Sequence, residues 1–441
     1  MTVKFPENVR WAIRKLNEAG FEAWAVGGCV RDSVLDKEPH DWDMTTSALP
    51  EETMAVFDGY PVIGTGLKHG TVTLLADHEP LEITTYRVDG SYSDGRRPDS
   101  VSFTRSLEED LARRDFTVNA MAAHPEKGII DCFGGLADLQ NGIIRCVGEP
   151  ERRFNEDALR ILRALRFSAV LGFSIEQKTA ETLIILRKNL HQVAMERIFS
   201  EFRRLICGKD AVRVLRDFPQ VFWEFMPELQ PMFGFQQHNP HHIHDVWEHT
   251  LCAVENTPAG EALRLAALLH DVGKPDTFTR DEDGIGHFYG HAEASVGRAG
   301  KMLSRLKADN DTRNRVLTLV QYHGADIPAR PAAVRRWLGK LGERGFFDLL
   351  AIKRADTLAQ APFCRERLAG LDALSDLAKE ILTEEQCFSL RQLAVDGRDL
   401  MKTGVPAGPE LGKLLQKLLE KVVEGECPND RDALLRLAKE L

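Results

Sequence analysis

The spacing of apolar residues changes once along this 441-residue chain, and the change constrains the fold more than any other feature. After a helical segment at residues 7–19, FEAWAVGG is typical of a short buried strand that ends in a glycine turn, and HDWDMTT, TVTLLA and LEITTYRV are short β-branched runs. Runs of this length with alternating polarity predict strands. From about Pro150 onward, segments such as EDALRILRALRFSAVLGF carry apolar residues at helical spacing. The predicted fold class is therefore α+β, with a small mixed sheet and its helices first and an all-helical region after them.

The charge of the chain excludes one way of binding nucleic acid. Its 57 Lys and Arg residues face 67 Asp and Glu residues, so a net charge of −10 argues against holding a polyanion by bulk charge alone. Residues 143–218 differ, because they contain 15 basic and 10 acidic residues and are net positive by 5. A polyanion is expected to bind to this stretch.

The eight cysteines are scattered without any CxxC pair. This spacing predicts buried thiols in a reducing cytosol, not a disulfide framework or a zinc ribbon. The N-terminus lacks a secretory pattern, and no run reaches the roughly 18 apolar residues of a membrane span. We therefore expect a cytoplasmic protein with no membrane partner.

The first motif with chemical meaning lies in the strand region. The pair Gly27–Gly28 ends a strand shortly before Arg31, and Asp41 and Asp43 follow at the start of the next strand. Residues i and i+2 of a strand point to the same side, so both carboxylates can bind one divalent cation. Glu82, in LEITTYRV, is a candidate third carboxylate. Each motif alone also suits a solvated turn, but together they match what two-metal nucleotidyl transfer requires.

Arginines form the second motif. Arg114 belongs to the segment RRDFTVNA, and Asp157, Arg160, Arg163 and Arg166 follow at helical spacing on one predicted stripe. Like charges at this spacing repel one another unless an anion or an acidic partner joins them. Arginine binds phosphate through two parallel hydrogen bonds, and an Asp/Arg pair can match the edge of a base. A nucleoside triphosphate is therefore a candidate ligand.

The order GG-x-VRD, DWD, RRDFTVNA and EDALR-x-x-R resembles the class II tRNA nucleotidyltransferase family, which includes CCA-adding enzymes and bacterial poly(A) polymerases. The match covers about the first 215 residues. The resemblance implies a polymerase-β-like head, a helical neck, and a body and tail that hold the acceptor arm of tRNA. Trp42 departs from the family pattern, in which an aliphatic residue is commoner at this position.

The same resemblance assigns roles to individual residues. It implies that Asp41 and Asp43 bind Mg²⁺ and are catalytic. Glu82 is the third catalytic candidate because of its place in the predicted strand, not because of the resemblance. The implied nucleotide-binding residues are Gly28, Arg31, Arg114, Asp157, Arg160, Arg163 and Arg166. Asp157 and Arg160 would pair with C or A in place of a nucleic-acid template. Residues 89–104 match the segment that helps the pocket switch from C to A.

Histidines form a third pattern in the helical region. His249, His270, Asp271 and Asp356 resemble the ligand set of the HD superfamily of metal-dependent phosphohydrolases, and His291 and His323 suit a second metal. Histidine and aspartate on separate helices favour a transition metal, so Mn²⁺, Ni²⁺, Fe²⁺ or Co²⁺ is a further candidate cofactor. A domain with a metal but without turnover is the alternative. The neighbouring histidines in HNPHHIH, residues 238–244, are interpreted as surface residues.

The motifs together predict four regions: a nucleotidyltransferase head at residues 1–145, a helical neck at 146–235, an HD-type metal-binding domain at 236–365 and a tRNA-binding tail at 366–441. The expected function is addition of CCA, or of its terminal A, to the 3′ end of tRNA from CTP and ATP. Two alternatives stay open. One is a poly(A) polymerase, and the other is an HD phosphohydrolase whose head only binds nucleotide or tRNA.

Overall fold

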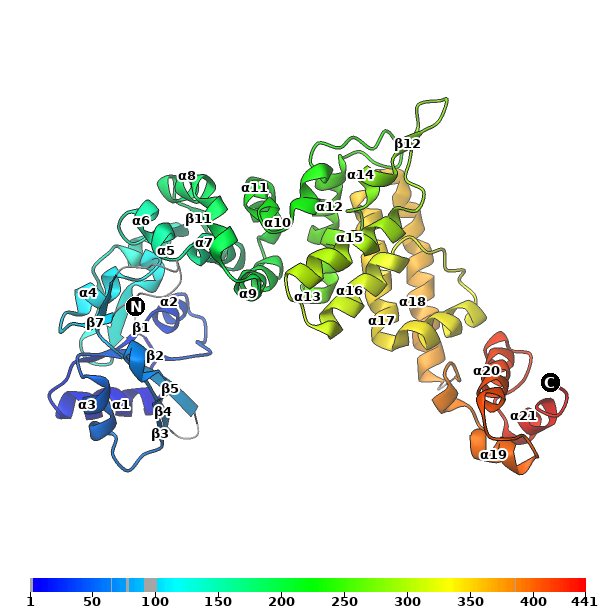
Figure 1. The fold of residues 1–441 in the computed structure, drawn as a ribbon, viewed down its shortest axis with the longest axis horizontal. Helices are drawn as coiled ribbons and strands as arrows, with labels where there is room; N and C mark the ends of the chain where they lie inside the picture. The colour runs from blue at the N-terminus through cyan, green and yellow to red at the C-terminus, as the bar shows by residue number, and fades with distance from the viewer. Residues whose placement is uncertain (1–2, 65, 77–78, 91–100, 385) are drawn as a thin grey trace. The chain divides into compact units, whose positions relative to one another are not determined.

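The computed structural model describes residues 3–64, 66–76, 79–90, 101–384 and 386–441 (Figure 1). The chain divides into two compact units, residues 1–227 and 228–441. The predicted α+β class is confirmed, because the large sheet belongs to the first unit and helices make up most of the rest.

The sheet of the first unit is mixed. Its strands lie in the order β3-β4-β5-β2-β1-β8-β9. Their bounds are β1 Ala23–Val26, β2 Asp43–Thr46, β3 Val62–Ile63, β4 Thr71–Ala76, β5 Glu79–Thr85, β8 Met121–His124 and β9 Gly128–Asp131. Strands β2 and β5 run parallel in a register that sets Asp43 opposite Glu82, whereas the other neighbours are antiparallel. The register thus brings two of the predicted carboxylates to adjacent strands.

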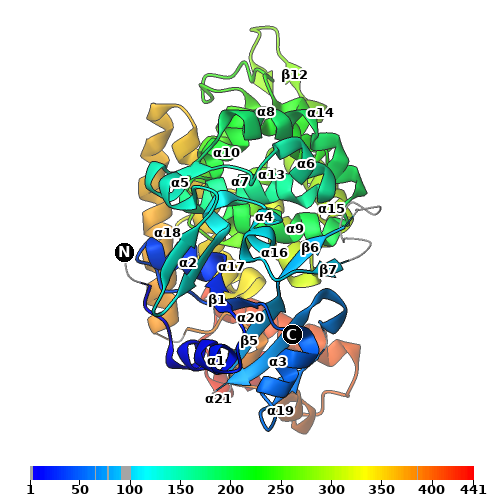
Figure 2. The same ribbon diagram turned by 90° about the vertical axis from the view of Figure 1, so that its left-hand side faces the viewer.

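Short helices cover this sheet. Helix α1 (Glu7–Glu18) confirms the helix predicted at 7–19 and packs against β1, while α3 (Pro50–Val56) packs against β4 (Figures 1 and 2). Helix α2 (Gly28–Val34) begins directly after β1. All four residues of β1 are buried, as its uninterrupted apolar sequence AWAV requires.

The start of strand β2 differs from the prediction. The strand begins at Asp43, so Asp41 precedes it. Trp42 is buried against Phe5, with 5.4 Å between the ring centroids, whereas Asp41 and Asp43 on either side of it are exposed. The aromatic ring at the unusual position therefore serves the core, and the two carboxylates stay accessible.

The predicted stripe from Asp157 to Arg166 is wrong at its first residue. Helix α6 (Pro150–Glu156) ends before Asp157, whose φ of −142° and ψ of 105° are extended, and α7 runs from Leu159 to Leu171. The Asp157 carboxylate accepts a hydrogen bond from the Leu159 N–H at 3.0 Å. Aspartate often competes in this way with helical hydrogen bonding, so only the arginines share one helix.

The region after residue 150 is not entirely helical, which corrects a second prediction. Strand β10 (Ile143–Ile144) pairs in parallel with β11 (Ser174–Ile175), and β12 (Thr279–Arg280) forms a hairpin with β13 (Gly286–His287). Strands of two residues are too short to show an alternating pattern, which is why sequence periodicity missed them.

The predicted loop 89–104 is described only at its two ends. There, β6 (Arg87–Asp89) pairs antiparallel with β7 (Val101–Phe103). Residues 91–100, the centre of the predicted loop, lie outside the described residues.

The remaining helices complete each unit. In the first unit they are α4 (Leu107–Ala112), α5 (Gly135–Asn141), α8 (Gln177–Ile185), α9 (Met195–Ile206), α10 (Ala211–Asp217) and α11 (Pro219–Trp223). In the second unit they are α12 (Val246–Glu255), α13 (Glu261–Leu269), α14 (Lys274–Thr277), α15 (His291–Arg305), α16 (Asn310–Tyr322), α17 (Pro331–Ala359), α18 (Arg367–Thr383), α19 (Gly397–Lys402), α20 (Pro409–Glu424) and α21 (Arg431–Leu437).

Helix α17 organises the second unit, because α12, α13, α16 and α18 all pack against it. It is broken at Gly342, where φ is 70°. Helices α19 to α21 enclose a small core of their own around Leu400, Leu418 and Leu434. Among the described residues, no helix combines the length and the apolar character that crossing a bilayer would need.

A buried ion pair connects the segment after α4 to helix α7. Asp115 accepts a hydrogen bond from Arg163 Nε at 2.7 Å and another from Asn119 at 3.2 Å. Burial by itself raises the pKa of Asp115, but the positive charges of Arg163 and Arg160 outweigh it and hold the pKa at about 2.

This pair predicts a dependence of stability on pH. Because the pKa of Asp115 is lower in the folded state, its stabilisation is present above the unfolded pKa and is lost as pH falls. Replacing Asp115→Asn is expected to flatten the fall in the free energy of unfolding of the first unit between pH 5 and pH 3 by about 1 kcal/mol. Urea unfolding at several pH values measures this. The exposed Asp217→Asn variant serves as control, and equal slopes for wild type and Asp115→Asn would contradict the prediction.

Candidate active site and metal centre

A cavity of about 530 Å³ lies in the first unit, beside the start of α2 and along α7. Eight arginines and three aspartates line it. This excess of positive charge favours an anionic ligand. All seven predicted nucleotide-binding residues line this one cavity, and they are Gly28, Arg31, Arg114, Asp157, Arg160, Arg163 and Arg166.

One aromatic ring orders several of these arginines. The guanidinium carbons of Arg31, Arg163 and Arg166 lie 5.1, 5.4 and 4.0 Å from the centroid of the Phe167 ring. At such distances the face of the ring attracts the cations. Phe167 therefore lets three arginines share one wall of the cavity.

Carboxylates compensate the remaining repulsion. Arg163 is bound to Asp115, Arg166 to Glu201 of α9, and Arg160 to Glu156 at 2.7 Å. The expectation that the arginines need an anion or acidic partner is thus met within the protein. The ion pairs fix the orientation of each guanidinium before any ligand arrives.

Asp157 and Arg160 are both held in place at the edge of this cavity. The second carboxylate oxygen of Asp157 accepts a hydrogen bond from Arg197 at 3.1 Å. Arg160 is buried and donates to the carbonyl oxygens of Arg153 and Arg113. Rigid polar groups of this kind can discriminate between bases, because a mismatched base would leave them without partners.

The lining residues that sequence reasoning did not assign to nucleotide binding include Arg197 and Arg204 of α9, and Asn119, which accepts a hydrogen bond from Arg31 at 2.7 Å. The two arginines lie in the net-positive stretch 143–218, so that charge count was a usable signal. Asn119 lies within the motif RRDFTVNA, but its contact with Arg31 depends on the fold.

The three predicted catalytic carboxylates are close but do not converge tightly. Asp43 lines the cavity, whereas Asp41 and Glu82 do not. Although the Asp43 side chain is exposed, the protein around it reduces its hydration, and this desolvation together with the negative charges of Glu82 and Asp41 raises its pKa. In the described part of the chain, only groups of histidines with Asp271 bring three ligand atoms within 4.8 Å of one another.

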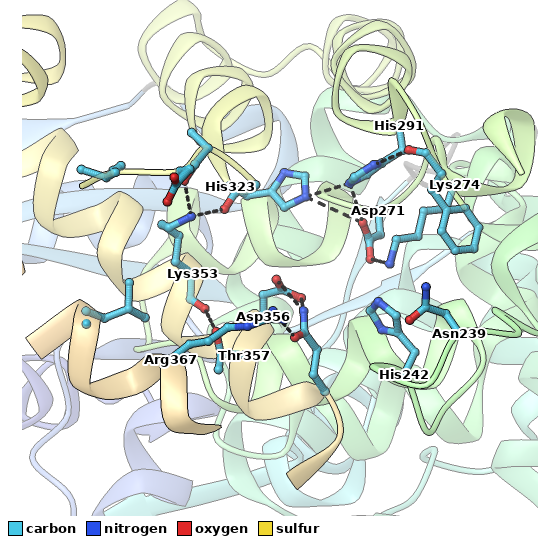
Figure 3. A pocket seen from close by; sticks show the side chains of 18 of the residues that line it. Asn239, His242, Asp271, Lys274, His291, His323, Lys353, Asp356, Thr357 and Arg367 are labelled. Carbon is cyan, nitrogen blue, oxygen red and sulfur yellow. Dashed lines mark hydrogen bonds and ion pairs between the residues drawn. The ribbon is translucent and has the colours of Figure 1, made fainter. Parts of the chain in front are cut away.

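A second site lies in the second unit, where the predicted histidines meet. His249 belongs to α12 and Asp356 to α17, while His270 and Asp271 follow α13 directly. His291 begins α15, and His323 follows α16. Figure 3 shows His291, His323 and Asp271 pointing toward one another at the wall of a cavity of about 660 Å³.

The distances divide the cluster into two groups that share Asp271. Its Oδ2 lies 3.3 Å from His249 Nε2 and 3.1 Å from His270 Nε2. Its Oδ1 lies 3.5 Å from His291 Nε2 and 3.8 Å from His323 Nε2. Each oxygen thus faces its own pair of histidines, an arrangement suited to a carboxylate that bridges two metals.

Backbone carbonyls orient all four histidine rings. The Nδ1 atoms of His270, His291 and His323 lie 2.7 to 2.8 Å from carbonyl oxygens three residues earlier, and that of His249 lies 3.3 Å from the Ala359 oxygen. An Nδ1–H group that donates to a carbonyl leaves Nε2 free to bind a metal. All four rings therefore direct Nε2 into the cluster.

The charges of the side chains in the histidine cluster also favour a bound cation. Oδ1 of Asp271 is buried without a hydrogen bond, whereas Oδ2 lies 2.7 Å from the ammonium of Lys274 and 3.3 Å from His249 Nε2. Burial raises the pKa of Asp271, but the charges of His270 and Lys274 outweigh it and hold the pKa well below its usual range. Burial lowers the pKa of His249, yet hydrogen bonds to Asp271 and Asp356 raise it to about 9. The carboxylates therefore hold positive charge at this point.

One histidine of the segment 238–244 is not a surface residue, which corrects the sequence interpretation. His242 lines the cavity, with its ring centroid 4.8 Å from that of His249. Its Nδ1 is buried without a partner, and burial together with the charge of Lys274 lowers its pKa to about 3. The sequence could not distinguish it from its exposed neighbour His238.

Three family models match the chain. Residues 23–145 match a model described as the poly A polymerase head domain. Residues 172–221 match the probable RNA and SrmB-binding site of polymerase A. Residues 277–438 match a model described as tRNA nucleotidyltransferase domain 2, putative.

Relatives match over nearly the full length. The chain is 36% identical to the CCA-adding enzyme of Lactobacillus delbrueckii subsp. bulgaricus over 425 residues, which is 96% of this chain and 94% of that protein. It is 34% identical to the CCA-adding enzyme of Leuconostoc mesenteroides, over 97% of this chain and 94% of that protein.

Solved structures agree. The crystal structure of the Bacillus stearothermophilus CCA-adding enzyme in complex with CTP has a TM-score of 0.73 and 30% identity, covering 99% of this chain and 98% of that one. The Thermotoga maritima CCA-adding enzyme complexed with tRNA shares the fold, with a TM-score of 0.58, 20% identity, and coverage of 98% and 94%. Both the sequence relatives and the structural likeness point the same way, and the chain belongs to the family of CCA-adding enzymes.

Proposed function

We propose that this protein adds CCA, or its terminal A, to the 3′ end of tRNA from CTP and ATP and releases pyrophosphate. The observation that carries the proposal is the arginine-lined cavity, where all seven predicted nucleotide-binding residues meet Asp43. Family membership supports the same reaction.

Each part of the cavity has a chemical task in this proposal. Arg31 and Arg114, beside the glycine turn at Gly27–Gly28, bind the triphosphate and offset its charge. A side chain at Gly27 would meet Arg114 Nη1 at 3.1 Å, and its φ of +80° also favours glycine. The phosphates can therefore approach the backbone closely.

The carboxylates fit a divalent cation such as Mg²⁺. Asp43 and Glu82 are register partners on β2 and β5. Desolvation and the negative charge of Glu82 raise the pKa of Asp43, and a bound cation would offset both effects. When bound, the metal lowers the pKa of the tRNA 3′-hydroxyl and offsets the charge on the leaving pyrophosphate. Asp41, Asp43 and Glu82 hold it and thereby orient the attacking hydroxyl.

Base selection is assigned to Asp157 and Arg160. Both present hydrogen-bonding groups whose orientation is fixed by Arg197 and by backbone carbonyls. The basic stretch 143–218 would hold the tRNA end. The proposed region boundaries are those at residues 145, 235 and 365.

The function is tested by incubating one tRNA transcript that ends at the discriminator base, and the same transcript ending in CC, with CTP, ATP or both. Addition of C, C and A followed by a stop supports a CCA-adding enzyme. Use of ATP on the CC end alone supports an A-adding enzyme. An unlimited A ladder would identify a poly(A) polymerase, and no extension at all would refute the proposal.

Replacing Asp43→Asn removes a metal ligand and is expected to lower the rate of nucleotide addition by at least about 100-fold, because the charge developing on the pyrophosphate is no longer offset. Gel-resolved extension under single-turnover conditions measures the loss. The exposed Asp36→Asn on the same segment is the matched control and should keep the wild-type rate. A full rate in Asp43→Asn would exclude its metal role.

Replacing Asp157→Asn keeps the oxygen that accepts from the Leu159 N–H at the start of α7 but changes the hydrogen bonds offered to a base. Discrimination of CTP over UTP and of ATP over GTP, measured as ratios of kcat/KM, is expected to fall by about 10-fold. The melting temperature should stay unchanged, as in the control Glu151→Ala. Equal loss of rate for all four nucleotides would point to a structural role only.

We propose a second function for the histidine cluster: a metal-dependent phosphohydrolase site of the HD type that binds one or two transition metals. The specific observation behind it is the convergence of four histidines and two aspartates, all with their Nε2 atoms or oxygens directed inward. Oδ1 of Asp271, which is buried without a hydrogen bond, supports the fit to a metal.

Because Asp271 belongs to both ligand groups, Asp271→Asn is expected to abolish binding of both metals, whereas His291→Ala should lose only one. Metal content after loading with Mn²⁺ and dialysis, measured by mass spectrometry, tests this. Hydrolysis of p-nitrophenyl phosphate should disappear with the metals, while nucleotide addition persists. The exposed Asp276→Asn is the control, and full metal content in Asp271→Asn would contradict the site.

A further inference from the structure

A buried carboxylate lies behind the wall of the arginine-lined cavity. Asp110 of α4 is fully buried, with 0% of its surface exposed, and it does not line the cavity itself. A charged carboxylate is stable away from water only where cations and hydrogen-bond donors surround it, because its desolvation is costly. The contacts of Asp110 therefore show which groups it holds in place.

The two oxygens of Asp110 contact three separate parts of the first unit. Oδ1 accepts hydrogen bonds from Arg113 Nε at 3.0 Å and Nη2 at 2.8 Å, and from the N–H of Arg87, where β6 begins, at 3.3 Å. Oδ2 accepts from Thr45 Oγ1 of β2 at 3.1 Å and from Arg114 Nη2 at 3.4 Å. Burial raises the pKa of Asp110, but the positive charges of Arg113 and Arg114 outweigh it and lower the pKa, so the carboxylate is charged.

The two terminal nitrogens of Arg114 lie at different groups. Nη2 lies at Asp110, whereas a side chain on Gly27 would meet Nη1 at 3.1 Å, so Nη1 lies beside the glycine turn. The Nε atom is buried and has no hydrogen-bond partner among the described residues. Arg114 and Gly27 both line the cavity. A carboxylate thus holds one end of the guanidinium, and the other end lies where the phosphates are proposed to bind.

Thr45 connects the same carboxylate to the strand of a proposed metal ligand. It follows Asp43 by two residues in β2, and its hydroxyl lies 3.0 Å from the carbonyl oxygen of Thr84 in β5 and 3.1 Å from Asp110 Oδ2. Asp110 therefore joins β2 to Arg114. Nucleotidyl transfer needs a fixed spacing between the metal and the groups that bind the phosphates, because a small displacement of the reacting atoms lowers the rate.

We propose that Asp110 is a positioning residue for nucleotide addition, which fixes Arg114 beside the glycine turn so that its guanidinium binds the incoming nucleotide. This inference rests on the proposed nucleotidyltransferase function and adds a residue that does not touch the nucleotide. A purely structural ion pair would need only Arg113, which forms two hydrogen bonds with Oδ1. The other oxygen is directed at an arginine of the cavity wall.

Nucleotide binding without tRNA tests this role of Asp110. Replacing Asp110→Asn keeps the size of the side chain but removes the charge that holds Arg114. The affinity of the full chain for ATP and for CTP, measured by calorimetry with Mg²⁺, is expected to fall by about 10-fold. In tRNA extension, KM for both nucleotides should rise by the same factor. The KM for tRNA and the discrimination of CTP over UTP should stay at wild-type values, and kcat should change less than KM.

A double-mutant cycle separates positioning from a contribution to stability. If Asp110 acts through Arg114, the double variant Asp110→Asn/Arg114→Ala should bind ATP no more weakly than Arg114→Ala alone. Asp348→Asn of α17, which breaks a buried ion pair with Arg315, is the matched control. It should lower the melting temperature but keep the wild-type affinity for ATP. Losses that multiply in the double variant, or a wild-type affinity in Asp110→Asn, would overturn the inference.

Failure of folding and failure of the proposed function can both be recognised. If Asp110→Asn does not fold, Arg113→Gln/Asp110→Asn is compared with Arg113→Gln, because the double change removes a positive charge together with the negative one. The same loss of about 10-fold in ATP affinity is expected. If the wild type extends no tRNA but Asp110→Asn still loses ATP affinity, the function fails and the role of Asp110 in nucleotide binding stands. If tRNA is extended and the variant binds ATP normally, the function stands and the positioning role fails.

Discussion

Eight arginines can share one cavity in the first unit only because carboxylates and an aromatic ring lie among them. Asp115 and Glu201 pair with arginines of α7, and Phe167 lies beneath three guanidinium groups. Without these partners, repulsion would separate α7 from the segments that pack against it. The same pairs fix the positions of the groups that bind phosphate and read a base, so the stability of this unit and its proposed specificity depend on one network.

In the second unit the charges are reversed, because carboxylates and not arginines lie at the centre of the site. The buried Asp271 and the partly buried Asp356 attract positive charge, and four histidines direct Nε2 at them because their Nδ1 atoms lie against backbone carbonyls. Oδ1 of Asp271 is buried without a hydrogen bond, and a metal could satisfy it. The chain thus combines a proposed triphosphate site with a separate proposed metal site.

Much of the fold and most of the candidate sites could be predicted from the sequence. Helical spacing located α1, and short β-branched runs located β4 and β5, because long or strongly alternating segments carry a clear period. The two-residue strands β10 to β13 carried none. Asp157 was expected within a helix. Instead its side chain accepts a hydrogen bond from the Leu159 N–H at the start of α7. The spacing of apolar residues does not reveal that an aspartate side chain competes in this way with helical hydrogen bonding.

The sequence by itself determined which residue types were available: paired carboxylates, the arginines of α7, and histidines at the spacing of separate helices. Only the tertiary structure decided which of them meet. It placed the partly buried His242 in the wall of the histidine cavity, left His238 exposed, and brought Arg197 to Asp157. The reason is physical, since contacts between residues far apart in sequence depend on register and packing, which no local pattern encodes.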